Sequence, residues 1–254
     1  SGGSLTQSSI LLTNKGVNAD YVRQIINLTQ TTSGSYLLLA SLDISRRNLA
    51  LRGEESFAKV MDMAEYARME INEIGGYYAY GKELVNGTSV YDYDVTKLSV
   101  HTLGLGLAGI EVYDLLRDEY DIQIEFGDVS NILAYISIGD RLQDIERLVG
   151  ALADIARIYK KDSTGMLSGE FISPIVARSP QEAFYSAKES LPVEKTEGRI
   201  SGEFVMCYPP GIPILAPGEM ITDEIIQYIL YVKEKGCSMQ GTEDKSVNKL
   251  KVLV

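Results

Sequence analysis

Hydrophobic residues recur every three or four positions over the first part of the chain, which is the spacing of one helix face. The stretch from about Tyr36 to Ile74 is predicted to be largely helical, its second half has this spacing from Phe57 to Ile74, and Gly75 and Gly76 follow it directly. Glycine commonly stands just past a helix end, so we expect the helix to stop there. A shorter helix is predicted from about Ala19, with Asn18 as its N-cap. Residues 5–14 predict a short strand that runs into a turn.

The pattern changes after residue 90, where short apolar runs alternate with helical ones. Strands are expected in KLSVHTL, DIQIEF and NILAYIS, and helices in LAGIEVYDLLRDEY and in residues 142–159. Strands and helices in this order indicate an α/β or α+β layer. We therefore place a domain boundary near residue 90.

The last third of the chain contains residue patterns typical of helix starts and ends. Ser179, Pro180 and Glu182 have the spacing of a capping box with proline in the first turn. Thr222 is expected to cap a last helix that ends at Gly236, and residues 201–206 predict a strand.

Composition narrows the class of protein. The chain has 254 residues, of which 45% are hydrophobic, so it can bury a large core. No run approaches the roughly 20 apolar residues of a membrane helix. A formal net charge of −11 argues against a nucleic-acid partner, because phosphate binding depends on clustered Lys and Arg. Two distant cysteines and one histidine give no disulfide framework or zinc site, and a reducing, cytoplasmic setting is expected.

Two candidate motifs receive a structural interpretation. LGLGLAG, at 103–109, lies between a predicted strand and a predicted helix, but it lacks the GxGxxG pattern of a dinucleotide loop. We interpret it as a tight turn rather than a nucleotide site. His101 lies in a predicted strand, and we interpret it as structural rather than catalytic.

CYPPGIPILAPGE, at 207–219, concentrates four of the seven prolines. Proline fixes φ and removes a backbone donor, so this segment should be rigid, mostly extended and excluded from a central strand. Such a segment is suited to holding the Glu219 carboxylate in place for a distal ammonium or guanidinium group. The alternative is that the prolines only route the chain and that Glu219 belongs to the first turn of the next helix.

RISGEFVMCYPPGIPILAPGEMIT resembles the C-terminal segment of the Orn/Lys/Arg decarboxylases of the pyridoxal-phosphate fold-type I class. SLTQSS, TTSGSYLLLASLD, DVTKL, DIQIEFGD, NILAYISIGD and SPQEAFYSAKE also resemble family blocks, in the family's order. The resemblance implies an α/β chain of fold type I. Residues 1–90 would end the large cofactor-binding domain, and residues 91–254 would form the small C-terminal α/β domain.

The same resemblance implies where the site residues lie. The Schiff-base lysine would immediately precede Ser1, so the sequence is expected to be the C-terminal part of a longer enzyme with no catalytic residue in this segment. Thr31, with Thr32 and Ser33 as alternates, would lie near the cofactor phosphate of a neighbouring subunit; a plain turn is the alternative. Many relatives have Pro where Gly34 stands, so this loop is expected to be less rigid. Glu219 matches the family's acidic residue that binds the distal cation of the substrate.

The implied function is decarboxylation of a basic amino acid with pyridoxal 5'-phosphate. Arginine giving agmatine for polyamine synthesis is favoured, with lysine and ornithine as alternatives. A homodimer or higher homo-oligomer, a small-molecule substrate, no metal, no nucleic acid and no membrane partner are expected. Two other classes stay open: a pyruvoyl-dependent decarboxylase that starts at Ser1, and a regulatory homologue without catalysis.

Overall fold

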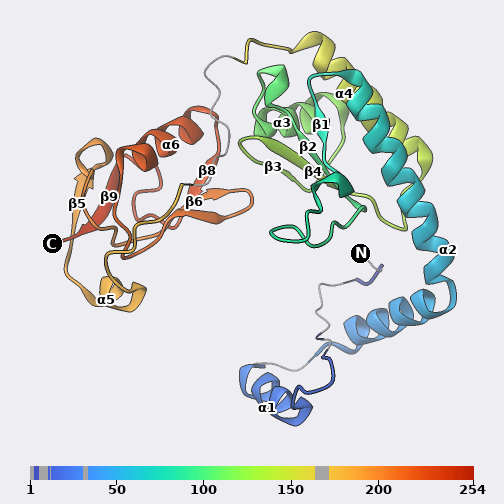
Figure 1. Cartoon of the computed structure of the whole chain (residues 1–254), viewed down its shortest axis with the longest axis horizontal. Helices are drawn as coiled ribbons and strands as arrows, with labels where there is room; N and C mark the ends of the chain where they lie inside the picture. The colour runs from blue at the N-terminus through green and yellow to red at the C-terminus, as the bar shows by residue number, and fades with distance from the viewer. Residues whose placement is uncertain (1–2, 6–10, 12, 31–33, 164–171) are drawn as a thin grey trace. The chain divides into compact units, whose positions relative to one another are not determined.

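The computed structural model describes residues 3–5, 11, 13–30, 34–163 and 172–254 (Figure 1). The fold is mixed α and β, as predicted. It divides into two compact units, one of Ser1–Asp62 with Ser137–Asp140 and the other of Met63–Ile136 with Arg141–Val254.

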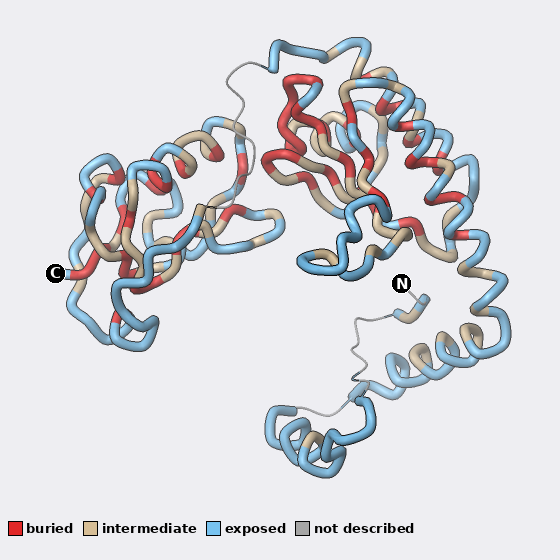
Figure 2. Tube along the Cα trace, in the orientation of Figure 1, coloured by how far each residue is buried: buried red, intermediate tan, exposed pale blue. Residues whose placement is uncertain are grey.

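The first unit contains helix α1 (Ala19–Thr29) and the start of helix α2 (Tyr36–Ile74). Asn18 caps α1 as predicted, since its Oδ1 accepts hydrogen bonds from the amides of Asp20 and Tyr21, each at 3.1 Å. The bounds of α2 agree with the predicted run of residues 36–74. No described residue before Val60 is buried, so α1 and the first half of α2 expose their apolar faces (Figure 2).

The second half of α2 enters the second unit at Met63 and is buried there at Met63, Ala64, Ala67 and Ile71. The first sheet of the second unit is antiparallel, with its strands in the order β1-β2-β4-β3. The strands are β1 (Tyr78–Ala79), β2 (Lys97–His101), β3 (Phe126–Gly127) and β4 (Asn131–Tyr135). Helix α3 (Gly109–Tyr120) contacts β3, β4 and helix α4 (Leu142–Ile158). Single-turn 3-10 helices occur at Lys82–Leu84 and Leu103–Leu105.

The C-terminal part of this unit has two further antiparallel sheets. Strand β6 (Val205–Tyr208) lies between β7 (Ile212–Leu215) and β8 (Ser238–Gln240), and β5 (Lys188–Pro192) pairs with β9 (Lys249–Leu253). A 3-10 turn (Val193–Lys195) follows β5. Helix α6 (Asp223–Glu234) covers the core with Ile225, Ile226, Ile229 and Val232.

Both helix caps predicted in this part are confirmed. Helix α5 (Pro180–Tyr185) begins with the capping box, in which the Glu182 amide donates to Ser179 Oγ at 3.2 Å and the Ser179 amide donates to the Glu182 carboxylate at 2.9 Å. Thr222 Oγ1 accepts from the Ile225 amide at 3.3 Å at the start of α6. Gly236 follows α6 with a φ of 81°.

Several strands differ from the sequence-based expectation. The strand predicted at 201–206 occurs at 205–208, and only the last residue of DIQIEF lies within a strand, β3. The proline segment is not one extended stretch, because residues 208–212 turn back to form the β6–β7 hairpin. Pro213 lies in the edge strand β7, as expected for proline, but the exclusion of the whole segment from a central strand was wrong, because Cys207 and Tyr208 end β6, which lies between β7 and β8. Most of the strand expected at 5–14 lies outside the described residues, and its described members are not in a strand.

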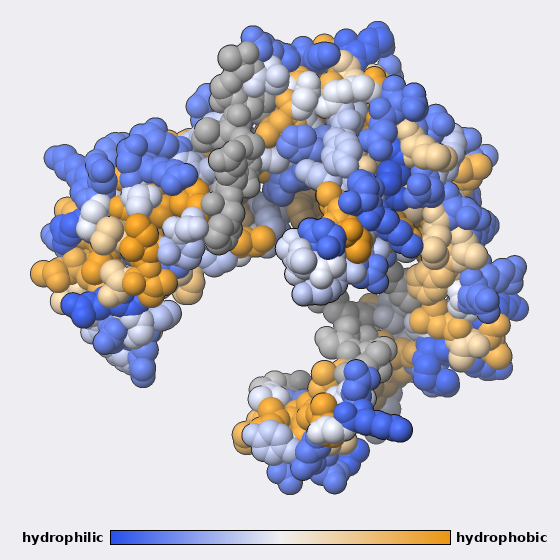
Figure 3. Space-filling view, viewed as in Figure 1, coloured by the Kyte–Doolittle hydropathy of each residue, from blue (hydrophilic) through white to orange (hydrophobic). Residues whose placement is uncertain are grey.

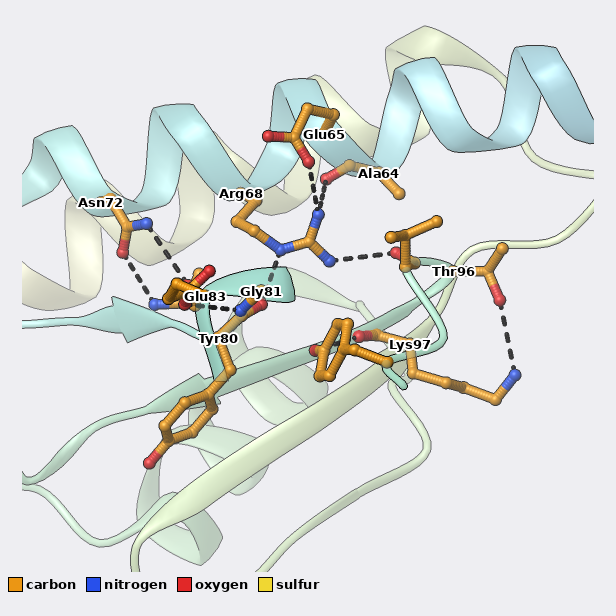
Figure 4. Close-up of polar contacts among 12 residues, drawn as sticks. Ala64, Glu65, Arg68, Asn72, Tyr80, Gly81, Glu83, Thr96 and Lys97 are labelled. Carbon is orange, nitrogen blue, oxygen red and sulfur yellow. Dashed lines mark hydrogen bonds and ion pairs between the residues drawn. The ribbon is translucent and has the colours of Figure 1, made fainter. Parts of the chain in front are cut away.

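A buried arginine joins α2 to the segment that leads into the sheet (Figure 4). Arg68 is 5% exposed, and its guanidinium donates to the carbonyls of Tyr80 at 2.6 Å and Val95 at 3.0 Å. It also forms an ion pair with Glu65 at 2.9 Å. A buried charge is tolerated when it is paired and hydrogen-bonded, so Arg68 serves as a polar anchor for this segment.

Candidate functional site

Glu219 lies in a short loop between β7 and α6, and the residue before it explains how the loop is held. Gly218 has a φ of 95°, and a Cβ there would lie 2.3 Å from the Arg178 carbonyl oxygen. The Gly218 amide donates to Ser201 O at 2.9 Å, and its carbonyl accepts from the Ala177 and Arg178 amides at 2.9 and 3.0 Å. The loop is therefore fixed on both sides, at a position that only glycine fits.

The Glu219 side chain is half-buried and is held by its own loop. Oε2 accepts a hydrogen bond from the Ala216 amide at 2.8 Å, and the Glu219 carbonyl accepts from the Ser201 amide at 2.8 Å. Within the part of the chain that the structure describes, Oε1 has no hydrogen bond. A carboxylate oxygen accepts two bonds, so Oε1 and one lone pair of Oε2 are open to a ligand. Glu219 precedes α6 and is not in its first turn.

The predicted phosphate-binding residues, Thr31, Thr32 and Ser33, lie outside the described residues. They stand in the sequence between α1, which ends at Thr29, and α2, which begins at Tyr36. Three hydroxyl groups without added charge form a donor set that suits a phosphate ester. The resemblance would also place Ser4, Ser8 and Ser9 shortly after the Schiff-base lysine, with a structural role in a strand as the alternative. Ser8 and Ser9 lie outside the described residues, and Ser4 is half-buried.

The LGLGLAG segment is a tight turn, as interpreted from the sequence. A Cβ at Gly109 would lie 2.0 Å from the Asn131 carbonyl oxygen, and one at Gly104 would lie 2.6 Å from the Gly76 carbonyl oxygen. These glycines permit close backbone packing. The Glu111 carboxylate accepts from the Ala108 amide at 2.8 Å, so a negative charge of the protein itself occupies the start of α3, where a phosphate would bind.

His101 makes its contacts within the sheet. Its Nδ1 lies 3.3 Å from Asn131 Oδ1, which also accepts from the Tyr80 hydroxyl at 3.3 Å. The Tyr80 ring packs edge-on against the imidazole, with ring centroids 6.4 Å apart. These contacts support the structural interpretation of His101. Among the described residues, no group of three or more His, Cys, Asp or Glu side chains is arranged to hold a metal ion.

Two family models match most of the chain. Residues 1–144 match the family described as "Orn/Lys/Arg decarboxylase, major domain", and residues 169–245 match "Orn/Lys/Arg decarboxylase, C-terminal domain". The chain belongs to the Orn/Lys/Arg decarboxylase family. Both the long α2 region and the Glu219 loop fall within the matched residues of this family.

Curated relatives in the family include bacterial arginine decarboxylases. The chain is 41% identical to arginine decarboxylase of Bacillus subtilis and 42% identical to that of Halalkalibacterium halodurans, in each case over 99% of this chain and 52% of the relative. It is 30% identical to the constitutive lysine decarboxylase of Escherichia coli over 41% of this chain and 15% of the relative. The chain thus spans about half the length of the arginine decarboxylases that it matches.

Solved structures in the family share the fold. The lysine decarboxylase of Francisella novicida matches with a TM-score of 0.70 at 18% identity, over 94% of this chain and 46% of that structure. The E. coli constitutive lysine decarboxylase matches with a TM-score of 0.68 at 18% identity, over 94% of this chain and 46% of that structure. Among the helices that the structure describes, none has the length and apolar character needed to cross a bilayer.

A polar cluster around Asp128 was missed by sequence reasoning. Asp128 accepts from the amides of Ser130 and Asn131, and through Asn131 the turn connects to Tyr80 and His101. The sequence GDVSN carried the local signal, since an Asp two residues before a Ser favours an Asx turn. Tyr80 and His101 come from distant segments, so sequence spacing does not predict that they lie beside this turn.

Proposed function

We propose that this chain is the C-terminal part of a pyridoxal-phosphate-dependent decarboxylase of basic amino acids, with arginine as substrate and agmatine as product. The observation that carries the proposal is the Glu219 carboxylate, held by the Ala216 amide and open at Oε1. The similarity to curated arginine decarboxylases over 99% of the chain supports it. The proposal includes a role in polyamine synthesis, in the cytoplasm.

Glu219 would bind the cationic end of the substrate. Oε1 is free and Oε2 retains a lone pair, so the carboxylate can accept two parallel N–H bonds from a planar guanidinium. An ammonium group is a point charge, so it would bind to the same oxygens without forming two parallel bonds. Binding the far end of a long side chain orients the reacting end, which is how remote contacts raise the rate.

Hydroxyl groups of Thr31, Thr32 and Ser33 would donate to the cofactor phosphate. When bound, pyridoxal phosphate withdraws the electrons left on the substrate as carbon dioxide departs. A phosphate contact from a neighbouring subunit would make at least a homodimer necessary for activity. In this proposal residues 1–90 end the large domain and residues 91–254 form the small one; that division stays a prediction.

Lysine is the second candidate substrate, because the chain is also similar to E. coli lysine decarboxylase over 41% of its length. The two substrates differ in the cation that reaches Glu219. A guanidinium can form two parallel hydrogen bonds to the Glu219 carboxylate, whereas an ammonium is attracted as a point charge. Arginine is therefore expected to have the higher kcat/KM.

The test uses the full-length protein, with its upstream residues and pyridoxal phosphate. Amine product is quantified by mass spectrometry after incubation with arginine, lysine or ornithine in separate reactions. We expect agmatine to form with the highest kcat/KM of the three. Absence of amine product from all three substrates would contradict the proposal, and a preference for lysine would replace arginine with the second candidate.

A further inference from the structure

A cavity of about 340 Å³ lies within the second unit, beside the β6–β7 hairpin that contains Pro209 and Pro210. One wall is the turn at residues 128–131, and the other includes Pro209, Pro210, Ile212 and Tyr228. Among its described lining residues there is neither a lysine nor an arginine, and Glu219 is not one of them. The described lining thus combines a largely apolar wall with one carboxylate, that of Asp128.

The Asp128 side chain is held rigidly by its own turn. Oδ1 accepts from the Ser130 amide at 2.8 Å, from the Asn131 amide at 2.6 Å and from Asn131 Nδ2 at 3.4 Å. The backbone is held too, since the Ile110 amide donates to Asp128 O at 2.7 Å. Throughout the described ranges, Oδ2 has neither a hydrogen bond nor an ion pair. Oδ1 is saturated, so Oδ2 alone is open to a ligand.

The neighbouring groups respond to this negative charge. Burial is the main cause that raises the pKa of Tyr228 to about 12, and the negative charge of Asp128 adds to it. The pKa of Tyr80 is also raised, first by burial and then by Asp128. Among the described lining residues, the Asp128 carboxylate is the one formal charge, and it adds to burial in raising both pKa values. A ligand with a positive charge would be favoured there, and an anion would be repelled.

We propose that this cavity binds an alkylammonium ion, with the ammonium on Asp128 Oδ2 and the carbon chain against Pro209, Pro210 and Ile212. The single open oxygen selects ammonium over guanidinium, because a guanidinium fork needs two acceptor positions. Glu219 has both of its oxygens partly open, so the two carboxylates differ in the cation that they suit. Pro209 and Pro210 have restricted backbones, so this side of the cavity loses little conformational freedom when a ligand binds.

The test measures binding of n-butylammonium to the full-length protein by saturation-transfer NMR, with n-butanol as the neutral probe. The variant Asp128→Asn removes the charge but keeps a side-chain oxygen for the Ser130 and Asn131 amides. We expect n-butylammonium to bind this variant at least about tenfold more weakly, as loss of a charge-assisted hydrogen bond predicts. The control Asp121→Asn removes a fully exposed carboxylate and should leave binding unchanged.

Two further variants keep the test decisive. Ile212 lines the cavity and is 67% exposed, so Ile212→Trp can fill the space without disturbing the core, and it should abolish binding. Glu219→Gln should retain it. Equal binding of n-butanol, unchanged binding in Asp128→Asn or Ile212→Trp, or loss in Glu219→Gln would overturn the assignment. No turnover is measured, so the result is independent of the decarboxylase proposal.

Discussion

Glycine is required at position 218 for two separate reasons. Its φ of 95° is unfavourable for a residue with a Cβ, and that Cβ would lie 2.3 Å from the Arg178 carbonyl oxygen. Gly236 has a similar φ of 81° but open space around it. A side chain at position 236 would meet backbone strain alone, whereas one at position 218 would meet both backbone strain and a steric clash.

Gly218→Ala is expected to destabilise the protein more than Gly236→Ala. The Gly236 variant carries only the left-handed strain, about 1–2 kcal/mol, whereas the Gly218 variant must also move a loop pinned by backbone hydrogen bonds. Thermal unfolding of the full-length variants measures the difference. Equal unfolding midpoints would show that the loop yields to the methyl group, and the rigid placement of Glu219 would then be wrong.

At the scale of elements, helices were predicted better than strands. The bounds of α2 and the caps of α1, α5 and α6 are set by residues within a few positions of each other, so spacing and capping chemistry suffice. The strand at 205–208 and the two-residue β3 depend on pairing with β7, β8 and β4, which sequence spacing does not reveal. The cavity near Asp128 escaped prediction for the same reason, because residues 128–131 and 207–228 meet only in the folded chain.

Arg68 links α2 to the segment before β2, and its removal tests that link. Arg68→Ala leaves the Tyr80 and Val95 carbonyls without their donor, which is expected to cost about 2–4 kcal/mol. Arg46→Ala is the control, because Arg46 forms an exposed pair with Asp43 on the same helix and should cost under about 0.5 kcal/mol. Denaturant unfolding of both variants provides the comparison, and similar losses would contradict the anchoring role.

Glu111 stabilises the start of α3 in a manner that depends on pH. Burial raises its pKa, but hydrogen bonds from Lys161 at 2.8 Å and from the Ala108 amide outweigh burial, and the net pKa lies below its ordinary value of 4.5. The contribution is therefore present above pH 4.5 and is lost as the pH falls below it.

Glu111→Gln should destabilise the protein by about 1 kcal/mol at pH 7, with the difference shrinking below pH 4.5. The unfolding free energy as a function of pH measures this. Glu125→Gln, which removes an exposed carboxylate, should show no such trend. A Glu111→Gln deficit that stays constant down to pH 3 would contradict the electrostatic explanation.

At the scale of the whole molecule, the exposed apolar residues of the first unit stand out. Tyr36 is 89% exposed, Leu28 81% and Leu37 77%, and hydrophobic side chains gather over α1 and the first turns of α2 (Figure 3). A segment without buried side chains gains little from hydrophobic burial on its own. This agrees with a chain that spans about half the length of the curated relatives it matches.

The most direct test of the central claim compares arginine decarboxylation by full-length wild type and Glu219→Gln. Glutamine keeps an oxygen for the Ala216 amide and removes only the charge, so the loop should stay in place. KM for arginine should rise and kcat/KM should fall by about 10- to 100-fold, while Glu197→Gln, an exposed change, should match wild type. Unchanged kinetics in Glu219→Gln would contradict the role of this carboxylate as the binding group for the substrate cation.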